Sequence, residues 1–230
     1  MKAAEKDLHY RLYPVWDPLL RLLHWWIAFT LLAQFISGSI LLILGDSMSD
    51  QLMESFDLVH IYTGYALAAG LALRLVWLFA GPAEARWRDL LPLTARQRRV
   101  WRQTLSCYLS GFRRPVEPYR GHNAFAAPAY LAFYGIAAAQ VTLGLILSRM
   151  SDDERMNSVL MNWHDWGFYL LLGFAVIHIL MVVMHEIKGR HNMVSAMIHG
   201  HKAFTEAETR QMNDSASAGA DAATRTARKP

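Results

Sequence analysis

The sequence predicts an all-α membrane protein in which four transmembrane helices form a bundle, with both termini in the cytoplasm. Three observations lead to this prediction. The chain has 230 residues, of which 53% are hydrophobic. Its apolar residues gather into four stretches long enough to cross a membrane. The connections between these stretches differ sharply in their Lys and Arg content, which is typical of loops sorted to opposite membrane faces.

The four apolar stretches cover residues 19–44, 57–81, 124–147 and 163–185. An α-helix needs about 20 residues to cross a hydrocarbon core about 30 Å thick, so each stretch suffices for one span. We expect one transmembrane domain over residues 19–203, preceded by a cytoplasmic segment, residues 1–18. Residues 204–230 are rich in Ala, Ser, Thr and Asp and are expected to form a disordered cytoplasmic tail. No internal repeat is apparent.

The orientation follows from the basic residues of the connections. Residues 82–123 contain nine arginines, whereas residues 45–56 contain no Lys or Arg and three acids, Asp46, Asp50 and Glu54. Because positive charge near span ends is retained in the cytoplasm, the loop 82–123 and both termini should lie there. No signal peptide is evident, so the first span is the expected insertion signal. The net charge of +4 thus reflects topology, and no nucleic-acid partner is expected.

An amphipathic helix is predicted in the loop between the second and third spans. Thr94 and Gln97 form a capping-box pattern that marks a helix start. Apolar residues then recur at near-helical spacing beside several arginines, at Val100, Trp101, Leu105, Tyr108, Leu109 and Phe112. We expect this helix to lie on the cytoplasmic membrane surface. A docking surface for a partner is the alternative.

Histidines at two depths indicate a cofactor site. His164 and His178 are 14 residues apart, so in a helix they point nearly the same way and are separated by about 21 Å along its axis. His24 lies near the cytoplasmic start of the first span and His60 near the outer start of the second. Depth therefore pairs His60 with His164 and His24 with His178. Ionisable groups at membrane depth are usually functional, and imidazoles are axial ligands of haem iron, so two pairs suggest two haems.

Other interpretations of the histidines stay open. Each one alone could be an ordinary hydrogen-bonded residue of a non-catalytic assembly protein. A zinc- or copper-binding membrane protein would need three or four ligands at one depth. His185 competes with His178 but lies at the very end of its span. The remaining histidines fall outside the spans and are expected to be solvated: His9, His122, His191, His199 and His201. Cys107 is the single cysteine, so haem could not be attached covalently.

Two glycines and an arginine share the histidine-bearing helix faces. Gly38 lies 14 residues after His24, and Gly64 one turn after His60. A residue without a side chain would let a porphyrin approach the backbone, although close helix packing explains these glycines equally well. Arg74, 14 residues after His60, would suit a haem propionate. The alternative is that Arg74 extends its side chain to the membrane surface.

Several segments resemble a known family. They are residues 15–25 (VWDPLLRLLHW), 59–64 (VHIYTG), 119–123 (YRGHN), 163–167 (WHDWG) and 174–178 (FAVIH). They resemble the bacterial b-type cytochromes that anchor NiFe hydrogenases, within the cytochrome b561 superfamily, over about residues 10–202. The gamma subunit of respiratory formate dehydrogenase is similar in spacing.

The resemblance implies a four-helix cytochrome b of the bacterial inner membrane. By motif, His24, His60, His164 and His178 match haem-ligating positions, although some members retain one haem. Such a protein passes electrons between a periplasmic partner and the quinone pool, as the electron-transfer subunit of a quinone-reducing complex. The partner would be a hydrogenase small subunit or, for a stand-alone cytochrome b561, a c-type cytochrome. Four residues at the cytoplasmic level could line a quinone pocket or merely reach the membrane surface: Arg21, Trp25, Glu186 and Lys188.

Overall fold

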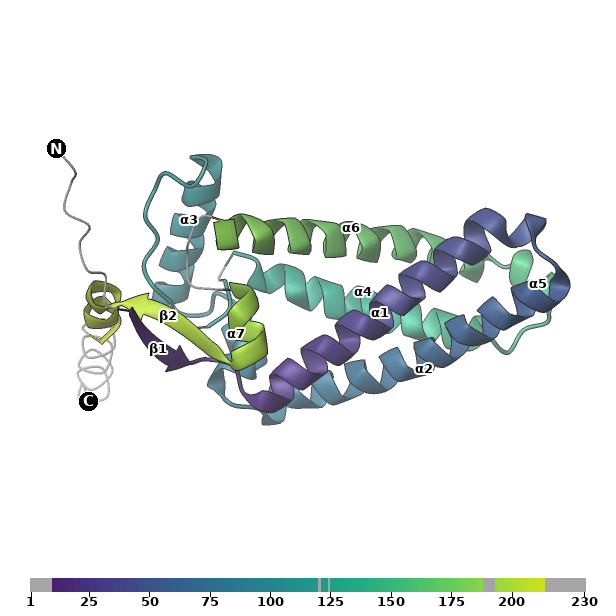
Figure 1. Ribbon diagram of the computed structural model, residues 1–230, viewed down its shortest axis with the longest axis horizontal. Helices are drawn as coiled ribbons and strands as arrows, with labels where there is room; N and C mark the ends of the chain where they lie inside the picture. The colour runs from purple at the N-terminus through teal and green to yellow at the C-terminus, as the bar shows by residue number, and fades with distance from the viewer. Residues whose placement is uncertain (1–9, 120, 124, 188–192, 214–230) are drawn as a thin grey trace, which may run out of the picture.

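Four long helices form the body of the protein in this computed structural model (Figure 1). They are α1 (Pro18–Leu44), α2 (Asp50–Ala80), α4 (Ala127–Leu147) and α6 (Val159–Ile187). All four are long and apolar enough to cross a membrane, which confirms the predicted four-helix bundle. The structure describes residues 10–119, 121–123, 125–187 and 193–213. Lys188 and the segment 214–230 lie outside the described residues.

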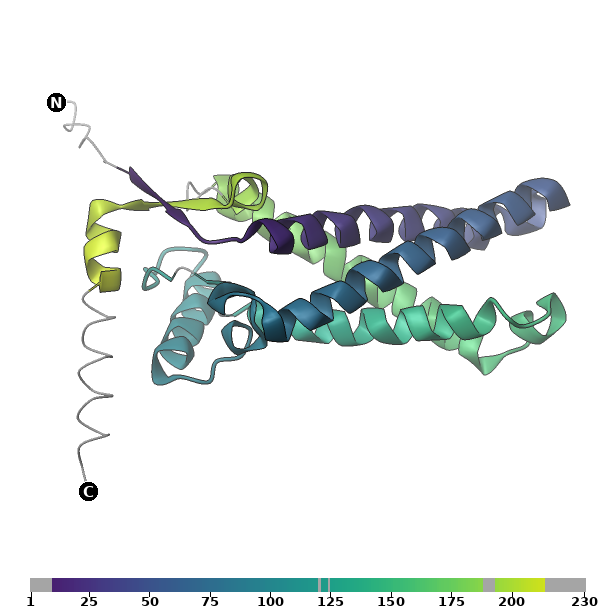
Figure 2. The same cartoon turned by 90° about the horizontal axis from the view of Figure 1, so that it is seen from below.

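The two ends of the bundle differ in structure. One end, here called the sheet end, carries a two-stranded antiparallel sheet of β1 (Tyr10–Pro14) and β2 (His201–Thr205), together with α3 (Ala95–Leu109) and α7 (Met193–His199). Among the described residues, the other end, the α5 end, carries the short 3₁₀ helix Gly45–Ser47 and helix α5 (Asp152–Met156). Figure 2 shows α1 and α4 on opposite sides of the bundle, with α2 and α6 crossing between them.

Local sequence sets where the long helices begin. Asp17 caps α1 by accepting a hydrogen bond from the Leu20 amide at 2.9 Å, and Pro18 occupies the first helical turn. The same Asp17 carboxylate accepts from Trp77 Nε1 at 3.2 Å, which ties the end of α2 to the start of α1. Helix α2 begins at Asp50, seven residues before the predicted span. Residues 50–56, which mix polar and apolar side chains, form its first two turns.

Apolar side chains fill the middle of the bundle and also cover its outside. The central core comprises Ile27, Leu31, Leu67, Leu71, Phe133, Ala137 and Leu171. Large apolar side chains also point outward, for example Phe79 at 70% exposure and Ile177 at 64%. In water such a surface would be an aggregation hazard, whereas lipid tails solvate it, so the outward faces are those of membrane-spanning helices.

The sheet corrects two expectations about the ends of the domain. Residues 10–14, for which the expected cytoplasmic segment 1–18 carried no predicted strand, form β1 and pair with β2. The predicted disordered tail is wrong for residues 204–213: Phe204 is fully buried, and a helical segment follows from residue 206 to 213. Thr205 and Glu208 form a second capping box at its start, and Met212 packs inward at 4% exposure. The prediction from composition overlooked the capping box and the apolar residues that pack inward.

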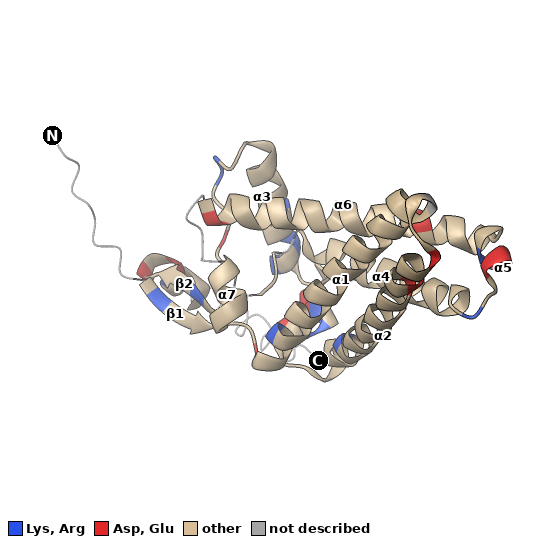
Figure 3. Cartoon of the chain, turned by 45° about the vertical axis from the view of Figure 1, so that its right-hand side comes forward, with Lys and Arg blue, Asp and Glu red and all other residues tan. Residues whose placement is uncertain are grey.

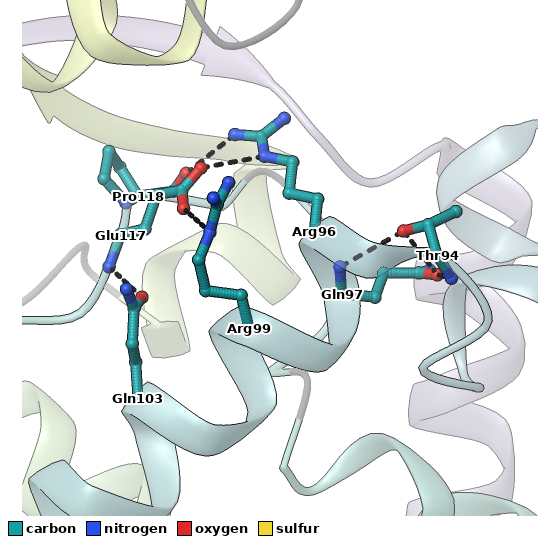
Figure 4. A network of polar contacts seen from close by, with 7 residues as sticks. All are labelled: Thr94, Arg96, Gln97, Arg99, Gln103, Glu117 and Pro118. Atoms are coloured by element: carbon teal, nitrogen blue, oxygen red, sulfur yellow. Dashed lines mark hydrogen bonds and ion pairs between the residues drawn. The ribbon is translucent and has the colours of Figure 1, made fainter. Parts of the chain in front are cut away.

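Helix α3 runs crosswise to the long helices at the sheet end (Figure 1). Its predicted capping box is present, with Thr94 and Gln97 bonded reciprocally. Val100, Thr104 and Cys107 face inward. Two of its arginines bind the nearly buried Glu117 carboxylate, Arg96 at 2.9 Å and Arg99 at 3.2 Å (Figure 4). These ion pairs hold the loop after α3 against the helix.

Charge is distributed unevenly between the ends. Acidic residues predominate around α5 and the start of α2, whereas Lys and Arg gather toward the sheet end (Figure 3). At the α5 end, Arg155 bridges Asp57 of α2 at 3.1 Å and Asp152 of α5 at 2.7 Å. This arrangement fixes α5 to α2 next to the histidine that follows Asp57 by three residues.

Candidate functional site: two histidine pairs

The four span histidines meet in two pairs, one at each end of the bundle. At the α5 end, His60 of α2 faces His164 of α6, with ring centroids 6.2 Å apart and ring planes at 81°. At the sheet end, His24 of α1 faces His178 of α6, with centroids 6.5 Å apart and planes at 55°. These are the two pairs that depth along the spans predicts. Their role as ligands stays a prediction.

The spacing of both pairs fits one metal ion held between two imidazoles. A metal–imidazole nitrogen bond is about 2.0–2.1 Å long, so rings on opposite sides of one ion have centroids about 6.3 Å apart. In each pair one ring has a buried Nδ1 without a hydrogen-bond partner in the described chain, His24 and His164. The ring spacing fits a metal-centred group that the protein chain itself does not supply.

The number of ligating side chains at each pair indicates which kind of metal centre could bind there. Within the described residues no group of three or more His, Cys, Asp or Glu side chains could hold a metal ion. Tetrahedral zinc sites use four ligands, or three plus water. Two facing imidazoles instead match the axial positions of a haem iron, whose four equatorial ligands belong to the macrocycle.

A cavity adjoins the α5-end pair. Its volume is about 90 Å³, smaller than the usual small-molecule site, and its walls are mostly apolar. His60, His164 and the predicted Gly64 line it, together with Gly144 of α4. At Gly64 an added Cβ would contact only the Gln34 amide, at 3.6 Å. The apolar lining beside two facing imidazoles suits a hydrophobic group bound between the rings.

A glycine lies against each ring of the α5-end pair and leaves space for it. A Cβ on Gly38 of α1 would lie 3.3 Å from His60 Cε1, and a Cβ on Gly144 of α4 would lie 3.4 Å from His164 Cε1. Gly38 therefore makes room for the His60 ring itself, a role that the porphyrin hypothesis for this residue did not include. Gly144 was not predicted, although it follows Gln140 with the same spacing by which Gly38 follows Gln34.

Two glutamines extend this correspondence between the halves of the chain. Gln34 Nε2 donates to the His60 carbonyl at 2.6 Å, and Gln140 Nε2 donates to the Trp163 carbonyl at 3.2 Å, beside His164. Each glutamine lies four residues before the glycine that contacts the neighbouring histidine. The structure thus shows a local equivalence of α1 with α4 and of α2 with α6, where no repeat was apparent in the sequence.

Aromatic rings surround the sheet-end pair. Phe174 stacks parallel to His178, with centroids 6.0 Å apart and planes at 5°. Tyr130 of α4 meets the same imidazole edge-on at 6.0 Å, and Trp25 meets His24 edge-on at 5.2 Å. His185, the competing histidine, lies outside the pair. Its Nδ1 bonds the Met181 carbonyl at 2.7 Å and its Nε2 lies 3.3 Å from Tyr108 Oη.

Arg74 is buried at the sheet end rather than extended to the surface. It is 1% exposed. Its Nε donates to Tyr134 Oη at 3.1 Å and one terminal nitrogen donates to the Ala85 carbonyl at 3.2 Å. No described carboxylate lies within ion-pair distance of it. Because a buried guanidinium without an anion is costly, this position suits an anionic group such as a propionate, which stays a prediction.

The residues expected to line a quinone pocket have structural partners. The Arg21 guanidinium donates to the Ile198 carbonyl, and Trp25 Nε1 donates to the Met197 carbonyl at 3.1 Å. Glu186 accepts from the Val194 amide at 3.4 Å. These contacts tie α7 to α1 and α6. All three side chains lie at the sheet end, as expected from their positions in the spans. The sequence did not predict α7, whose backbone they contact.

A buried polar cluster at the sheet end was not anticipated. The Asp89 carboxylate accepts from Tyr119 Oη at 2.8 Å, from the His122 amide at 2.8 Å and from His122 Nδ1 at 2.7 Å. Gly121 leaves the space that this carboxylate fills. Lys202 donates to the Gly121 carbonyl at 2.8 Å and lies 4.8 Å from the centre of the Trp16 ring. Hence the expectation that His122 is solvated is wrong: its side chain is 11% exposed.

Burial and mutual contact shift the titration of this cluster. Burial lowers the pKa of Lys202 to about 8, against the opposing influence of Asp89. Burial also lowers the pKa of His122 despite its bond to Asp89. Burial alone would raise the pKa of Asp89, but the hydrogen bonds and charge of His122 outweigh it and lower that pKa. The cluster is therefore an electrostatically coupled unit close to the His24 end of the bundle.

Comparison with known proteins places the chain in a family. The model of the prokaryotic cytochrome b561 family matches residues 15–200. The chain belongs to this family. As a cytochrome b561 protein, it is a multi-pass bacterial membrane protein of electron transport, and haem b is the cofactor that the family name implies.

Curated relatives of this cytochrome b561 protein are named for hydrogenase. A protein of Azotobacter vinelandii, "Probable Ni/Fe-hydrogenase B-type cytochrome subunit", is 27% identical over 84% of this chain and 89% of its own length. One of the same name from Rhizobium leguminosarum bv. viciae is 26% identical over 90% and 94%. "Probable Ni/Fe-hydrogenase 1 B-type cytochrome subunit" of Escherichia coli (strain K12) is 20% identical over 82% and 90%. All three correspond to this chain over most of their length.

Proposed function

We propose that this protein conducts electrons across the membrane between a periplasmic NiFe hydrogenase and the quinone pool, with two non-covalent haems b. His60 and His164 would hold one haem, and His24 and His178 the other. The observation that carries this proposal is the separation of 6.2 and 6.5 Å between facing imidazole centroids at two levels of one bundle. A haem iron with two histidine ligands supplies one-electron transfer and has no open position for oxygen.

The sheet end is proposed to face the cytoplasm. The loop 82–123 with its nine arginines belongs to this end, whereas the connections of the α5 end are dominated by acids. Retention of positive charge in the cytoplasm orients the bundle accordingly. The His60/His164 pair would then lie near the periplasmic partner. Fusing a cytoplasm-active reporter at residue 230 and measuring its activity in cells tests this orientation, which an inactive reporter would contradict.

Quinone reduction is proposed at the sheet end, in a cavity of about 330 Å³. Tyr108, His122, Asn123 and His185 line this cavity and offer donors suited to quinone carbonyls. Asn123 Nδ2 donates to Tyr108 Oη, so a Tyr108→Phe variant loses one such group without changing size. We expect its KM for quinone to rise several-fold with unchanged haem content. An unchanged KM would place the quinone elsewhere.

Electron delivery tests the function as a whole. In membranes that contain the cytochrome and its hydrogenase, hydrogen should produce a reduced b-type absorption band and a reduced quinone pool. His60→Ala and His24→Ala should each abolish hydrogen-dependent quinone reduction, whereas His199→Ala, at an exposed position on α7, should not. Reduction of the band by a c-type cytochrome but not by hydrogen would instead favour a stand-alone cytochrome b561.

A further inference from the structure

We propose that Ser37 is a positioning residue that fixes the tautomer and orientation of His60, and so sets this ligand apart from His164 and His24. The proposal rests on the proposed function, because it concerns the haem that His60 would hold. Ser37 lies on α1, is 2% exposed and has its Oγ 2.9 Å from His60 Nδ1. No motif in the sequence drew attention to it.

The hydroxyl geometry decides which group donates. Ser37 Oγ lies 2.7 Å from the Ala33 carbonyl oxygen, with a longer contact of 3.4 Å to the Gln34 carbonyl. A serine hydroxyl has one proton and two acceptor lone pairs. A carbonyl oxygen can only accept, so the Ser37 proton is committed to α1. Toward His60 the hydroxyl oxygen must therefore accept, and Nδ1 of His60 must carry a proton.

The tautomer follows directly. A neutral imidazole has one N–H and one lone pair, so a proton on Nδ1 leaves the lone pair on Nε2, the nitrogen that would bind the iron. The ring is also held in position. Gly38 contacts its Cε1 edge, and Gln34 Nε2 bonds the His60 carbonyl and Thr63 Oγ1, each at 2.6 Å. Three residues within five positions of α1, Gln34, Ser37 and Gly38, thereby orient both the ring and the backbone of His60.

His164 and His24 lack this support. Nδ1 of His164, across the cavity, and Nδ1 of His24, at the sheet end, are buried without a hydrogen-bond partner among the described residues. A hydrogen bond accepted from the remote N–H of a ligating histidine raises the basicity of the ligand and fixes its ring. A more basic ligand stabilises the oxidised metal. Ser37 should therefore lower the midpoint potential of the α5-end haem only.

Redox titration of purified variants tests the proposal. Ser37→Ala should retain both haems and raise the ratio of reduced to oxidised α5-end haem about two- to tenfold at fixed ambient potential, the range expected for one hydrogen bond. The sheet-end haem should not change. Ser37→Thr, which keeps the hydroxyl, should titrate like the wild type. Ser39→Ala, a serine two residues along the same helix, is the matched control.

Each outcome separates the two claims. If wild-type protein holds two haems and Ser37→Ala leaves both midpoints unchanged or shifts them equally, the Ser37 proposal is wrong while the two-haem function stands. A Ser37→Thr variant that titrates like Ser37→Ala would assign the effect to packing and also overturn the proposal. If wild-type protein holds no haem that His60→Ala removes, both proposals fall together.

Discussion

At the α5 end, the two halves of the chain place the same residue types at equivalent positions, whereas at the sheet end they do not. At the α5 end, Gln34, Gly38 and His60 of the first half have counterparts in Gln140, Gly144 and His164 of the second. At the sheet end the same spacing gives unlike residues. His24, ten residues before Gln34, corresponds to Tyr130, ten before Gln140, and His178, 14 residues after His164, corresponds to Arg74, 14 after His60.

This difference shows how one scaffold can build two unlike centres. The α5-end pair joins equivalent helices, α2 and α6, and both rings rest on glycines. The sheet-end pair joins non-equivalent helices, α1 and α6, and Tyr130 and Arg74 take the two positions that histidines could have occupied. Two haems in such surroundings should differ in potential, which favours electron flow in one direction.

Glycine substitution should remove haem from the α5 end alone. In Gly144→Leu the side chain would extend from a Cβ already 3.4 Å from His164 Cε1 and displace that ring. We expect about half of the bound haem to be lost, since one of two sites fails. Gly135→Leu on the same helix meets nothing within 4 Å of its Cβ and should keep full haem content in the pyridine haemochrome assay. Equal losses of haem in both variants would contradict a specific role of Gly144 in positioning His164.

Arg74 should matter for stability far more than an arginine of the α5 end. Arg74→Leu leaves the Tyr134 hydroxyl and the Ala85 carbonyl unpaired in a buried site. The free energy of unfolding should fall by about 2–5 kcal/mol. The control is Arg149→Leu, an exposed residue near α5, with an expected change under about 1 kcal/mol. Thermal unfolding in detergent measures both, and similar losses would contradict the proposed asymmetry.

The fold and the histidine pairing were accessible from sequence because both follow from helix geometry. Apolar length predicts the spans, and depth along them predicts that His60 meets His164 and that His24 meets His178. The sheet, the ordered residues 204–213 and the cluster around Asp89 were not accessible. Each depends on contacts between segments far apart in the chain, such as Lys202 with the Gly121 carbonyl. The roles of single polar residues such as Ser37 and Gln140 could not be predicted either, because their partners lie on neighbouring helices.

The sheet-end cluster should make stability depend on pH through Lys202. Its pKa, about 8 when folded, lies below the ordinary lysine value of 10.5, so the unfolded chain binds more protons between these values. Stability contributed by Lys202 therefore rises with pH above about 8. Lys202→Met should remove this contribution, and apparent melting temperatures between pH 8 and 10 should rise less steeply than in the wild type. Parallel profiles would show that Lys202 is solvated.

The ion pair of the α5 end should have the smallest effect. Arg155 and Asp57 are 24% and 33% exposed, so solvent and salt screen their attraction. Arg155→Ala should cost about 0.2–1 kcal/mol of stability, with the difference shrinking as salt is added. Melting temperatures at low and high ionic strength check this. A larger, salt-independent loss would mean that the bridge anchors α5 more firmly than its exposure suggests.

Haem stoichiometry decides whether each histidine pair binds a haem, because α6 supplies one histidine to each pair. We expect two haems b per chain in the purified wild-type protein and one in each of His164→Ala and His178→Ala. We expect two in His185→Ala, since that ring bonds Tyr108 and the Met181 carbonyl. A wild-type ratio of one, or unchanged ratios in both His164→Ala and His178→Ala, would contradict these expectations.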